Sequence, residues 1–281
     1  MSRPEHQAPA DLFYDQTEAK KYAQSSRMIE IQTSMANRAV ELLRLPDHPC
    51  YLLDVGCGSG LSGEVLTELG HHWVGADISE AMLGVANERG TEGDLVYTDM
   101  GQGVHFRPGS FDGCISISAL QWLCNADHKD HIPHKRLRAF FTALYKSLAK
   151  GARAIFQFYP ETPQQMELIT TQAMKAGFSG GLVVDYPNST KAKKIFLCLF
   201  AGEPSYDLPT GKSEEVSAEA APQNTVLFTA GTTQPKSKGK KSRKSIKDKA
   251  WAMKKKERAK LQGKKVGNDS KFSARRRGPK F

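Results

Sequence analysis

The chain has 281 residues, of which 39% are hydrophobic and 25% charged, enough for one α/β domain of ordinary size with an appendage. The N-terminus is polar and no apolar run reaches the length of a membrane span, so we expect a soluble, non-secreted protein that contacts no membrane. The five cysteines form no CxxC pair, which favours reduced thiols over disulfides and predicts no metal site.

The net charge of +10 conceals a strong asymmetry along the sequence. Residues 236–281 contain 20 Lys and Arg against three acidic residues, whereas residues 1–235 contain 20 basic and 27 acidic residues. An acidic body joined to a basic tail predicts a polyanionic partner that is held through the tail.

The predicted elements follow an α/β order. Residues 1–10 are expected to be disordered, and apolar positions from Asp11 to Leu45 recur at helical spacing until Pro46 ends the helix. The alternating elements beyond it predict a seven-stranded, mostly parallel Rossmann-like sheet with helices on both faces. We expect strands at 51–55, 72–77, 94–98, 111–118, 152–159, 181–185 and 195–200, and helices at 60–70, 79–88, 135–149 and 161–176.

These elements define one domain at 11–202, in which 11–45 forms an N-terminal helical lid. The apolar periodicity stops after Gly202, and residues 203–235, which are rich in Pro, Ser, Thr, Glu and Ala, predict a linker. Residues 236–281 form a flexible basic tail that we interpret as an RNA-binding and nuclear-targeting segment. A solvated arm without RNA contact is the alternative.

A glycine-rich turn follows the first predicted strand. Glycine stands at positions 56, 58 and 60, where the absence of a Cβ permits a positive φ and a close approach to a ligand. Gly-x-Gly-x-Gly with an acid two residues upstream is similar to the first motif of class I S-adenosylmethionine-dependent methyltransferases, whereas the dinucleotide fingerprint would need glycine at position 61. A turn without a ligand, with Cys57 as a packing residue, is the alternative. We assign five residues here to a cofactor site: Asp54, Gly56, Cys57, Gly58 and Gly60.

Two further acids end the next two predicted strands. Asp77 lies 23 residues after Asp54, the distance at which a strand-helix-strand unit delivers a carboxylate to a ribose. The methyltransferase resemblance implies that Asp99 meets the exocyclic amine of adenine and that Met100 packs against the ring. A helix-capping role for Asp77 and a turn role for Asp99 are the alternatives. The cofactor residues assigned here are Asp77, Ile78, Asp99 and Met100.

The segment after the fourth predicted strand is expected to face the substrate. Ser116 is placed with the cofactor. Gln121 and Trp122 are candidate catalytic residues that meet the target base, since an amide bonds a base edge and an indole offers a stacking face. Trp122 packed in the core beneath the next helix is the alternative.

The N-terminal lid contributes the remaining candidates. Tyr14, our third candidate catalytic residue, is expected to close the pocket together with Phe13 and Tyr22. Lys21 or Arg27 is placed to pair with the cofactor carboxylate, with a solvated helix face as the alternative for both charges.

Methyl transfer from a sulfonium is an in-line displacement that depends on aligning nucleophile, methyl group and sulfur. The substrate-facing segment lacks the Asn/Asp-Pro-Pro-aromatic pattern of amino methyltransferases, and no cysteine pair is placed for covalent attack on a pyrimidine. Nucleophiles that need no deprotonation are therefore favoured, which fits the N7 of guanine.

With these residues assembled, the chain resembles the eukaryotic small-subunit (18S) ribosomal RNA guanine-N7 methyltransferase family. The resemblance covers nearly the whole chain and is carried by the runs Leu12–Asp15, Cys50–Gly63, Asp99–Gly103, Phe111–Asn125, Ile169–Ala173, Gly177–Ser189 and Lys191–Phe200. It implies S-adenosylmethionine-dependent methylation of a guanine N7 in 18S rRNA and a role in small ribosomal subunit biogenesis and export. It also implies a nuclear protein, nucleolar and nucleoplasmic, with a fraction in the cytoplasm.

The resemblance further implies two partners: the precursor small ribosomal subunit and a small zinc-binding activator subunit that forms a heterodimer. In the usual strand order the third strand, Asp94–Thr98, lies at a sheet edge whose unpaired backbone groups invite an added strand, so we expect the activator there. Two other functions stay open. One is a small-molecule methyltransferase whose tail serves only import, and the other is an assembly factor whose role is largely independent of methyl transfer.

Overall fold

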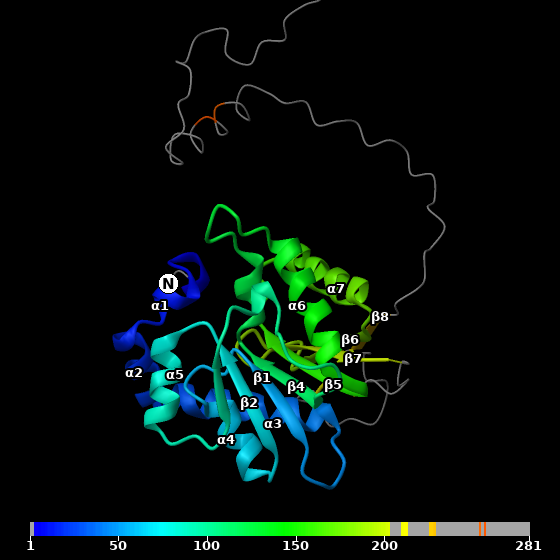
Figure 1. Ribbon diagram of the computed structural model, residues 1–281. Helices are drawn as coiled ribbons and strands as arrows, with labels where there is room; N and C mark the ends of the chain where they lie inside the picture. Colours follow the sequence, from blue (N-terminus) through cyan, green and yellow to red (C-terminus); the bar gives the residue numbers. More distant parts are fainter. Residues whose placement is uncertain (1–2, 203–208, 213–224, 229–252, 254–255, 257–281) are drawn as a thin grey trace, which may run out of the picture. The chain divides into compact units, whose positions relative to one another are not determined.

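The computed structural model describes residues 3–202, 209–212, 225–228, 253 and 256. The chain divides into two compact units, residues 1–232 and 233–281, and strands and helices alternate through the first (Figure 1). The predicted basic tail at 236–281, apart from Met253 and Lys256, and most of the predicted linker lie outside the described residues. Within the described part of the chain, no helix is long and apolar enough to cross a membrane.

One mixed sheet forms the centre of the first unit. Its strand order is β3-β2-β1-β4-β5-β7-β6-β8, in which β1 to β5 run parallel, β7 is antiparallel to β5 and β6, and β8 is antiparallel to β6. The predicted seven-stranded, mostly parallel sheet is confirmed, and β8 adds an edge strand. The strands are β1 Tyr51–Val55, β2 His72–Asp77, β3 Asp94–Tyr97, β4 Phe111–Ile117, β5 Leu148–Phe158, β6 Ser179–Asp185, β7 Lys194–Phe200 and β8 Thr225–Phe228.

The order of the strands reverses beside β1. Leu53 of β1 is in register with Val74 of β2 on one side and with Cys114 of β4 on the other. Because these strands are parallel, their carboxyl ends meet at one edge of the sheet, and the reversal opens a crevice there that suits a ligand. The acids predicted at the strand ends therefore gather at this edge.

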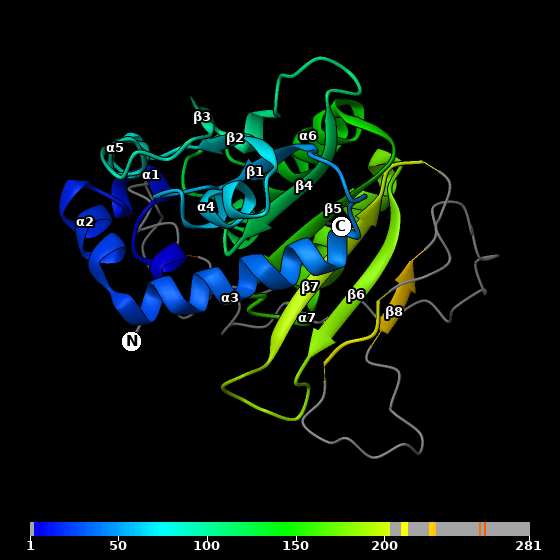
Figure 2. The same ribbon diagram turned by 90° about the horizontal axis from the view of Figure 1, so that it is seen from below.

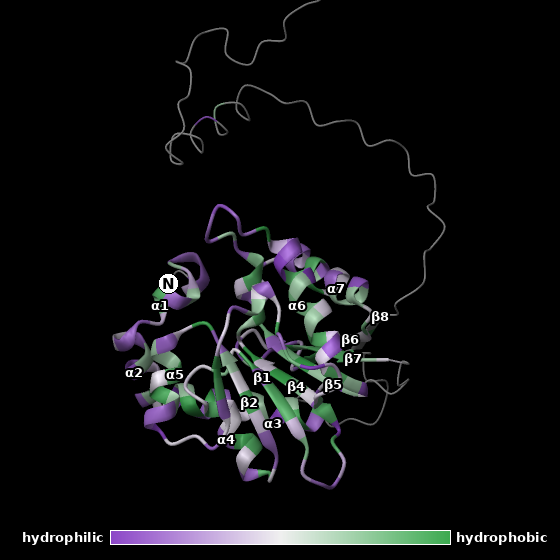
Figure 3. Ribbon diagram, viewed as in Figure 1, coloured by the Kyte–Doolittle hydropathy of each residue, from purple (hydrophilic) through white to green (hydrophobic). Residues whose placement is uncertain are grey.

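Helices cover both faces of the sheet, as predicted (Figure 2). Helices α3 and α4 pack on one face through residues such as Met35 and Leu66, and α6 and α7 pack on the other through Phe141 and Ile169. The helices carry purple as well as green residues in Figure 3, the pattern expected where one side of a helix meets a sheet. The helices are α1 Ala10–Phe13, α2 Gln16–Gln24, α3 Ser26–Leu43, α4 Leu61–Glu68, α5 Glu80–Glu88, α6 Pro133–Ser147 and α7 Pro163–Ala176, with 3-10 helices η1 Pro4–His6, η2 Met100–Gln102 and η3 Leu120–Cys124.

The single N-terminal helix predicted at 11–45 is wrong, because the structure divides this region into α1, α2 and α3. Asp15 caps α2: its side chain accepts hydrogen bonds from the backbone N–H groups of Thr17 and Glu18, both at 2.9 Å. Ser25 caps α3, where its hydroxyl accepts the N–H of Met28 at 3.4 Å. Short polar side chains of this kind compete with helix continuation, so the apolar periodicity runs across two breaks.

The prediction of disorder is also wrong for residues 3–10, which include η1. Arg3 donates to the carbonyl of Tyr159 at 2.9 Å, and Asn125 donates to the carbonyl of Glu5 at 3.2 Å. These partners lie 156 and 120 positions apart in the sequence, so local composition cannot reveal them.

The prediction of a linker at 203–235 is wrong for Thr225–Phe228, which form β8 and pair with β6. This strand is four residues long, and its sequence Thr-Val-Leu-Phe lacks the alternation of apolar and polar residues that marks a half-buried strand. A smaller difference concerns β5, which begins at Leu148 rather than at Ala152 because α6 ends at Ser147.

Candidate active site

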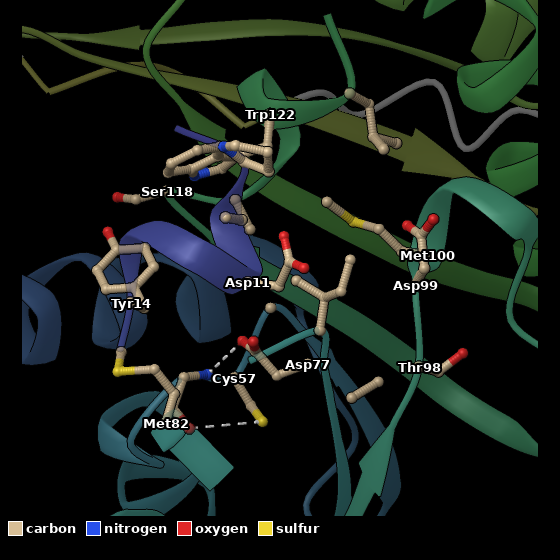
Figure 4. A pocket seen from close by; sticks show the side chains of 18 of the residues that line it. Asp11, Tyr14, Cys57, Asp77, Met82, Thr98, Asp99, Met100, Ser118 and Trp122 are labelled. Atoms are coloured by element: carbon tan, nitrogen blue, oxygen red, sulfur yellow. Dashed lines mark hydrogen bonds between the residues drawn. The ribbon is translucent and has the colours of Figure 1, made fainter. Parts of the chain in front are cut away.

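A cavity of about 590 Å³ opens at the carboxyl ends of the central strands. Its walls come from the segments that follow β1, β2, β3 and β4 and from the N-terminal lid. Figure 4 shows Tyr14, Asp77, Asp99, Met100 and Trp122 around this space. Cavities of this size hold ligands of nucleoside dimensions.

All three predicted glycines have a positive φ: +74° at Gly56, +52° at Gly58 and +84° at Gly60. A Cβ on Gly56 would lie 2.3 Å from the Cβ of Ala119, so only glycine lets the turn approach the segment after β4. A Cβ on Gly60 would lie 2.4 Å from Cγ2 of Thr91, which is a packing constraint behind the cavity. Gly56 and Gly58 line the cavity, whereas Gly60 is the N-cap residue of α4.

Asp77, at the end of β2, holds the glycine turn in place from the cavity wall. One carboxylate oxygen accepts the N–H of Gly58 at 2.8 Å, and the other accepts the N–H of Ser79 at 2.8 Å. The alternative role predicted for Asp77, that of a helix cap, is filled by Ser79 instead. Its hydroxyl accepts the N–H of Met82 in the first turn of α5. Burial raises the pKa of Asp77, and these backbone donors oppose the rise. Each carboxylate oxygen has a second lone pair that a ligand can use.

Asp54 lies beneath the glycine turn rather than at the cavity wall. Its side chain is fully buried, and one oxygen accepts the hydroxyl of Ser62 at 2.5 Å. The other oxygen has no hydrogen-bond partner among the described residues. Burial, with a smaller contribution from the charge of Asp77, raises the pKa of Asp54 to about 7 against the hydrogen bond from Ser62. A buried oxygen without a hydrogen-bond donor costs free energy, so this side chain lowers the stability of the fold.

Asp99, at the end of β3, caps η2 and also lines the cavity. One oxygen accepts the N–H of Gly101 at 2.8 Å and a guanidinium N–H of Arg136 at 2.6 Å. Asp99 therefore stabilises the turn and also faces the cavity, so the two predicted roles do not exclude each other. Met100 lies next to it at the same wall (Figure 4).

Helix η3 brings Trp122 to the cavity but not Gln121. The indole ring centroid lies 6.2 Å from that of Phe13 and 6.0 Å from that of Tyr14. Trp122 lines the cavity although it is only 8% exposed. The amide nitrogen of Gln121 instead donates to the carbonyl of Ser118 at 2.7 Å. A 3-10 helix has three residues per turn, so adjacent side chains point in different directions.

At the end of β4, Ser118 lines the cavity and the predicted Ser116 does not. Ser116 is buried within β4, whereas Ser118 follows the end of the strand with a φ of +60° and lines the cavity. The hydroxyl of Ser118 donates to the side-chain oxygen of Gln157 at 2.8 Å. The strand was predicted to continue to Ser118, but it ends at Ile117.

The N-terminal segment forms part of the cavity wall, to which it contributes Tyr14 and Tyr22. The hydroxyl of Ser79 donates to the carbonyl of Tyr14 at 2.8 Å, which joins the lid to the start of α5. Burial, followed by the charge of Asp77, raises the pKa of Tyr14 to about 12. The phenol is therefore protonated at neutral pH.

Comparison with known proteins identifies relatives along the full length of this chain. It is 57% identical to the 18S rRNA (guanine-N(7))-methyltransferase of Mus musculus over 282 residues, which cover 99% of this chain and 98% of that one. It is 47% identical to the 18S rRNA (guanine(1575)-N(7))-methyltransferase of Saccharomyces cerevisiae over 284 residues, or 100% of each chain. The chain belongs to the 18S rRNA (guanine-N7)-methyltransferase family.

Two family descriptions match different parts of this methyltransferase. "Methyltransferase domain" matches residues 53–156, and "Methyltransferase involved in Williams-Beuren syndrome" matches residues 199–279. Among solved structures, phosphoethanolamine N-methyltransferase 2 of Haemonchus contortus in complex with S-adenosyl-L-methionine aligns with a TM-score of 0.51. It is 14% identical, and the alignment covers 72% of this chain and 61% of that one. At this identity the likeness concerns the fold, and it agrees with the class I sheet.

The methyltransferase cavity gathers most, but not all, of the residues predicted from sequence. Those that line it are Tyr14, Tyr22, Gly56, Cys57, Gly58, Asp77, Ile78, Asp99, Met100 and Trp122. Five others lie outside the described lining: Phe13, Asp54, Gly60, Ser116 and Gln121. The cations Lys21 and Arg27 also lie outside it, and Lys21 pairs with Glu18 at 2.6 Å.

Several cavity residues of the methyltransferase were not predicted. They come from the lid, α5, α6 and the loop before α6: Asp11, Met82, Asp127, His128, His131 and Arg136. No local motif marks them, because these elements reach the cavity by packing against strands that are distant in sequence.

Proposed function

We propose that this chain transfers a methyl group from S-adenosylmethionine to the N7 of a guanine in 18S rRNA. The observation that carries the proposal is the identity of 57% and 47% to 18S rRNA (guanine-N7)-methyltransferases over essentially the whole chain. The cavity supports it independently, because a glycine turn followed by acids at successive strand ends suits a nucleoside-based cofactor.

The residues at the cavity fit this cofactor. Asp77 offers carboxylate lone pairs to the ribose hydroxyls, and such charge-assisted hydrogen bonds are strong. Asp99 and Met100 would hold the adenine, while Gly56 and Gly58 leave room for the methionine portion. When bound, S-adenosylmethionine supplies an activated methyl group on a sulfonium.

The side chains on the opposite wall are suited to alignment rather than to proton removal. Guanine N7 carries a lone pair, so no base has to deprotonate it. Tyr14, with a pKa of about 12, is a neutral hydrogen-bond donor at pH 7, and Trp122 offers a ring face for stacking. Holding the base in line by these two side chains supplies the orientation that an in-line displacement needs.

Mapping N7-methylguanosine in 18S rRNA tests the proposed function. Cells that lack this protein are expected to lose one methylated guanine, and re-expression of the wild-type chain should restore it. Unchanged methylation in the deficient cells would contradict the proposal. If the variant Asp77→Ala restores ribosome maturation but not methylation, the chain has an assembly role that is separate from methyl transfer.

We also propose that the zinc-binding activator subunit pairs along β3. This strand lies at the sheet edge and, within the described part of the chain, pairs with β2 alone. Tyr97 is 65% exposed, and Leu95 and Val96 are half-buried. The edge thus presents unpaired backbone groups together with apolar side chains, which an added strand would cover.

Amide hydrogen exchange of the heterodimer tests this site. Exchange at Asp94–Tyr97 is expected to slow in the complex, and Tyr97→Glu should weaken association at least about tenfold. Leu69→Glu, at another exposed apolar residue, is the control. A β3 that exchanges equally fast in the free and bound protein would place the activator elsewhere.

We infer a nuclear protein, nucleolar and nucleoplasmic, with a cytoplasmic fraction. The inference rests on the rRNA substrate and on the 20 Lys and Arg in residues 236–281. Removing residues 236–281 from a fluorescent fusion is expected to move the protein into the cytoplasm. An unchanged nuclear fraction would show that the tail is not the import signal.

A further inference from the structure

An open groove of about 600 Å³ lies between α6 and residues 102–108, outside the cavity. We call this surface the α6 groove. Val104, which is buried, and Ala139 contribute apolar surface to it. Its exposed lining residues include five that are basic, His105, His134, Lys135, Arg138 and Lys146, and none that is acidic.

Helix α6 is basic although the surrounding body is acidic. Pro133–Ser147 contains no Asp or Glu, while residues 1–235 contain 27 acidic and 20 basic residues. The first turn carries His134, Lys135 and Arg136, where the helix dipole favours acids, and the N-cap residue Ile132 supplies no side-chain cap. Positive side chains thus add to the positive end of the dipole, an arrangement that an external anion stabilises.

The basic side chains of α6 have two different surroundings. Arg136 lines the cavity and pairs with Asp99 at 2.6 Å. Lys135, Arg138 and Lys146 are exposed, and none of them forms an ion pair with another residue in the part of the chain that the structure describes. These three cations are therefore available to a ligand from solution.

The α6 groove and the cavity adjoin each other. Gln102 lines both, and α6 begins directly after the loop whose His128 and His131 line the cavity. A strand with one nucleotide in the cavity would bring its neighbouring phosphates to the groove. We propose that the α6 groove binds the phosphate backbone of the 18S rRNA strand that flanks the methylated guanine. This proposal rests on the rRNA substrate proposed above.

The composition of the groove favours phosphates over bases. Phe106, which lines it, packs edge-on against Phe111 with ring centroids 4.9 Å apart, so its ring already has a partner. Lys135 and Lys146 are about 16 Å apart along the helix axis at a rise of 1.5 Å per residue. A row of cations along a helix contacts the backbone and positions RNA without reading its sequence. The choice of guanine then stays with the cavity.

Charge reversal in the full-length chain tests the α6 groove. Lys135→Glu/Arg138→Glu is expected to bind an 18S oligoribonucleotide that spans the mapped guanine at least about tenfold more weakly. The slope of log affinity against log salt should become shallower by about 1.4, because each single-strand phosphate contact contributes about 0.7. S-adenosylmethionine affinity should be unchanged, since neither residue lines the cavity.

The matched control is Lys150→Glu/Lys175→Glu, which makes the same change of charge at exposed lysines outside the groove. Lys135→Gln/Arg138→Gln removes the charges without adding acids, and it should show the same change of salt slope with a smaller loss of affinity. This second variant keeps the test decisive if the charge reversal prevents folding.

Equal RNA affinity and methyl transfer in the groove and control variants would overturn the proposal. Competition by poly-glutamate as strong as that by RNA of equal charge would assign the groove to an acidic protein and would also overturn it. If the wild-type chain binds the RNA but methylates no guanine, the proposed function fails, and the binding comparison still decides on the groove.

Discussion

The two walls of the cavity are built in different ways. On the β1–β3 side, backbone and carboxylate groups interlock: the N–H of Gly58 donates to Asp77, and that of Gly101 donates to Asp99. On the β4 side, aromatic rings from distant segments meet, with Trp122 about 6 Å from the ring of Tyr14. The first wall depends on neighbouring strand-turn units, and the second depends on how the lid packs.

This difference separates cofactor binding from substrate alignment. Backbone donors held by short turns keep their geometry before a ligand arrives, which lowers the cost of binding. In the proposed function, the aromatic side chains that contact the lid orient the base. Substitutions in the first wall should therefore remove cofactor binding, and those in the second should slow methyl transfer while the cofactor still binds.

The largest expected effect is that of Asp77→Ala in the first wall. The variant loses the acceptor for the N–H groups of Gly58 and Ser79, and with it the carboxylate that we propose binds the ribose. We expect S-adenosylmethionine to bind about 1000-fold more weakly, which corresponds to about 4 kcal/mol. Isothermal titration measures the affinity, and Glu80→Ala, at the adjacent exposed acid, is the control. Affinity within tenfold of wild type would remove Asp77 from the cofactor site.

Gly56→Ala tests the point at which the two walls touch. A Cβ there would lie 2.3 Å from that of Ala119 and would also take a φ of +74°. Strain and overpacking together should lower the free energy of unfolding by about 3 kcal/mol. Gly70→Ala has a φ of +79° with no atom within 4 Å, so it should cost about 1 kcal/mol. Equal costs in urea unfolding would show that the walls are not in close contact.

The first wall could largely be predicted from the sequence, because its determinants are local. Gly56 and Gly58 follow one strand directly, and Asp77 ends the next. A helix break in the lid also has a local signal, because Asp15 with Glu18 three residues later fits a capping pattern, although the apolar periodicity continues across it.

The second wall could be predicted only in part. Trp122 lines the cavity and its neighbour Gln121 does not, because η3 directs the two side chains differently and no local pattern predicts a 3-10 helix here. The pairing of Arg136 with Asp99 joins residues 37 positions apart, and the contact of Asn125 with Glu5 joins residues 120 apart. Such contacts follow from packing, which a pattern of single residues does not contain.

Asp54→Asn measures how much the buried carboxylate of Asp54, next to the first wall, lowers the free energy of unfolding. Burial raises the pKa of Asp54 from 3.8 to about 7, so its contribution to stability is full below about pH 4 and is lost as the pH rises through 7. The variant carries no charge and should be more stable than wild type above pH 7, by about 1 to 3 kcal/mol. Urea unfolding from pH 4 to 8 measures this, with the exposed Asp94→Asn as control. Parallel pH profiles for wild type and Asp54→Asn would contradict the expectation.

Tyr14→Phe should have the smallest effect, and it separates the two walls most directly. Loss of one neutral hydrogen-bond donor is expected to slow methyl transfer about fivefold, or about 1 kcal/mol, with cofactor affinity unchanged. Because the pKa of Tyr14 is about 12, the ratio of wild-type to variant rates should stay constant from pH 6 to 9. Lys21→Ala, at an exposed residue of the lid that lies outside the cavity, is the control. If Tyr14→Phe weakens cofactor binding instead of the rate, the lid belongs to the cofactor site, and the two walls act as one.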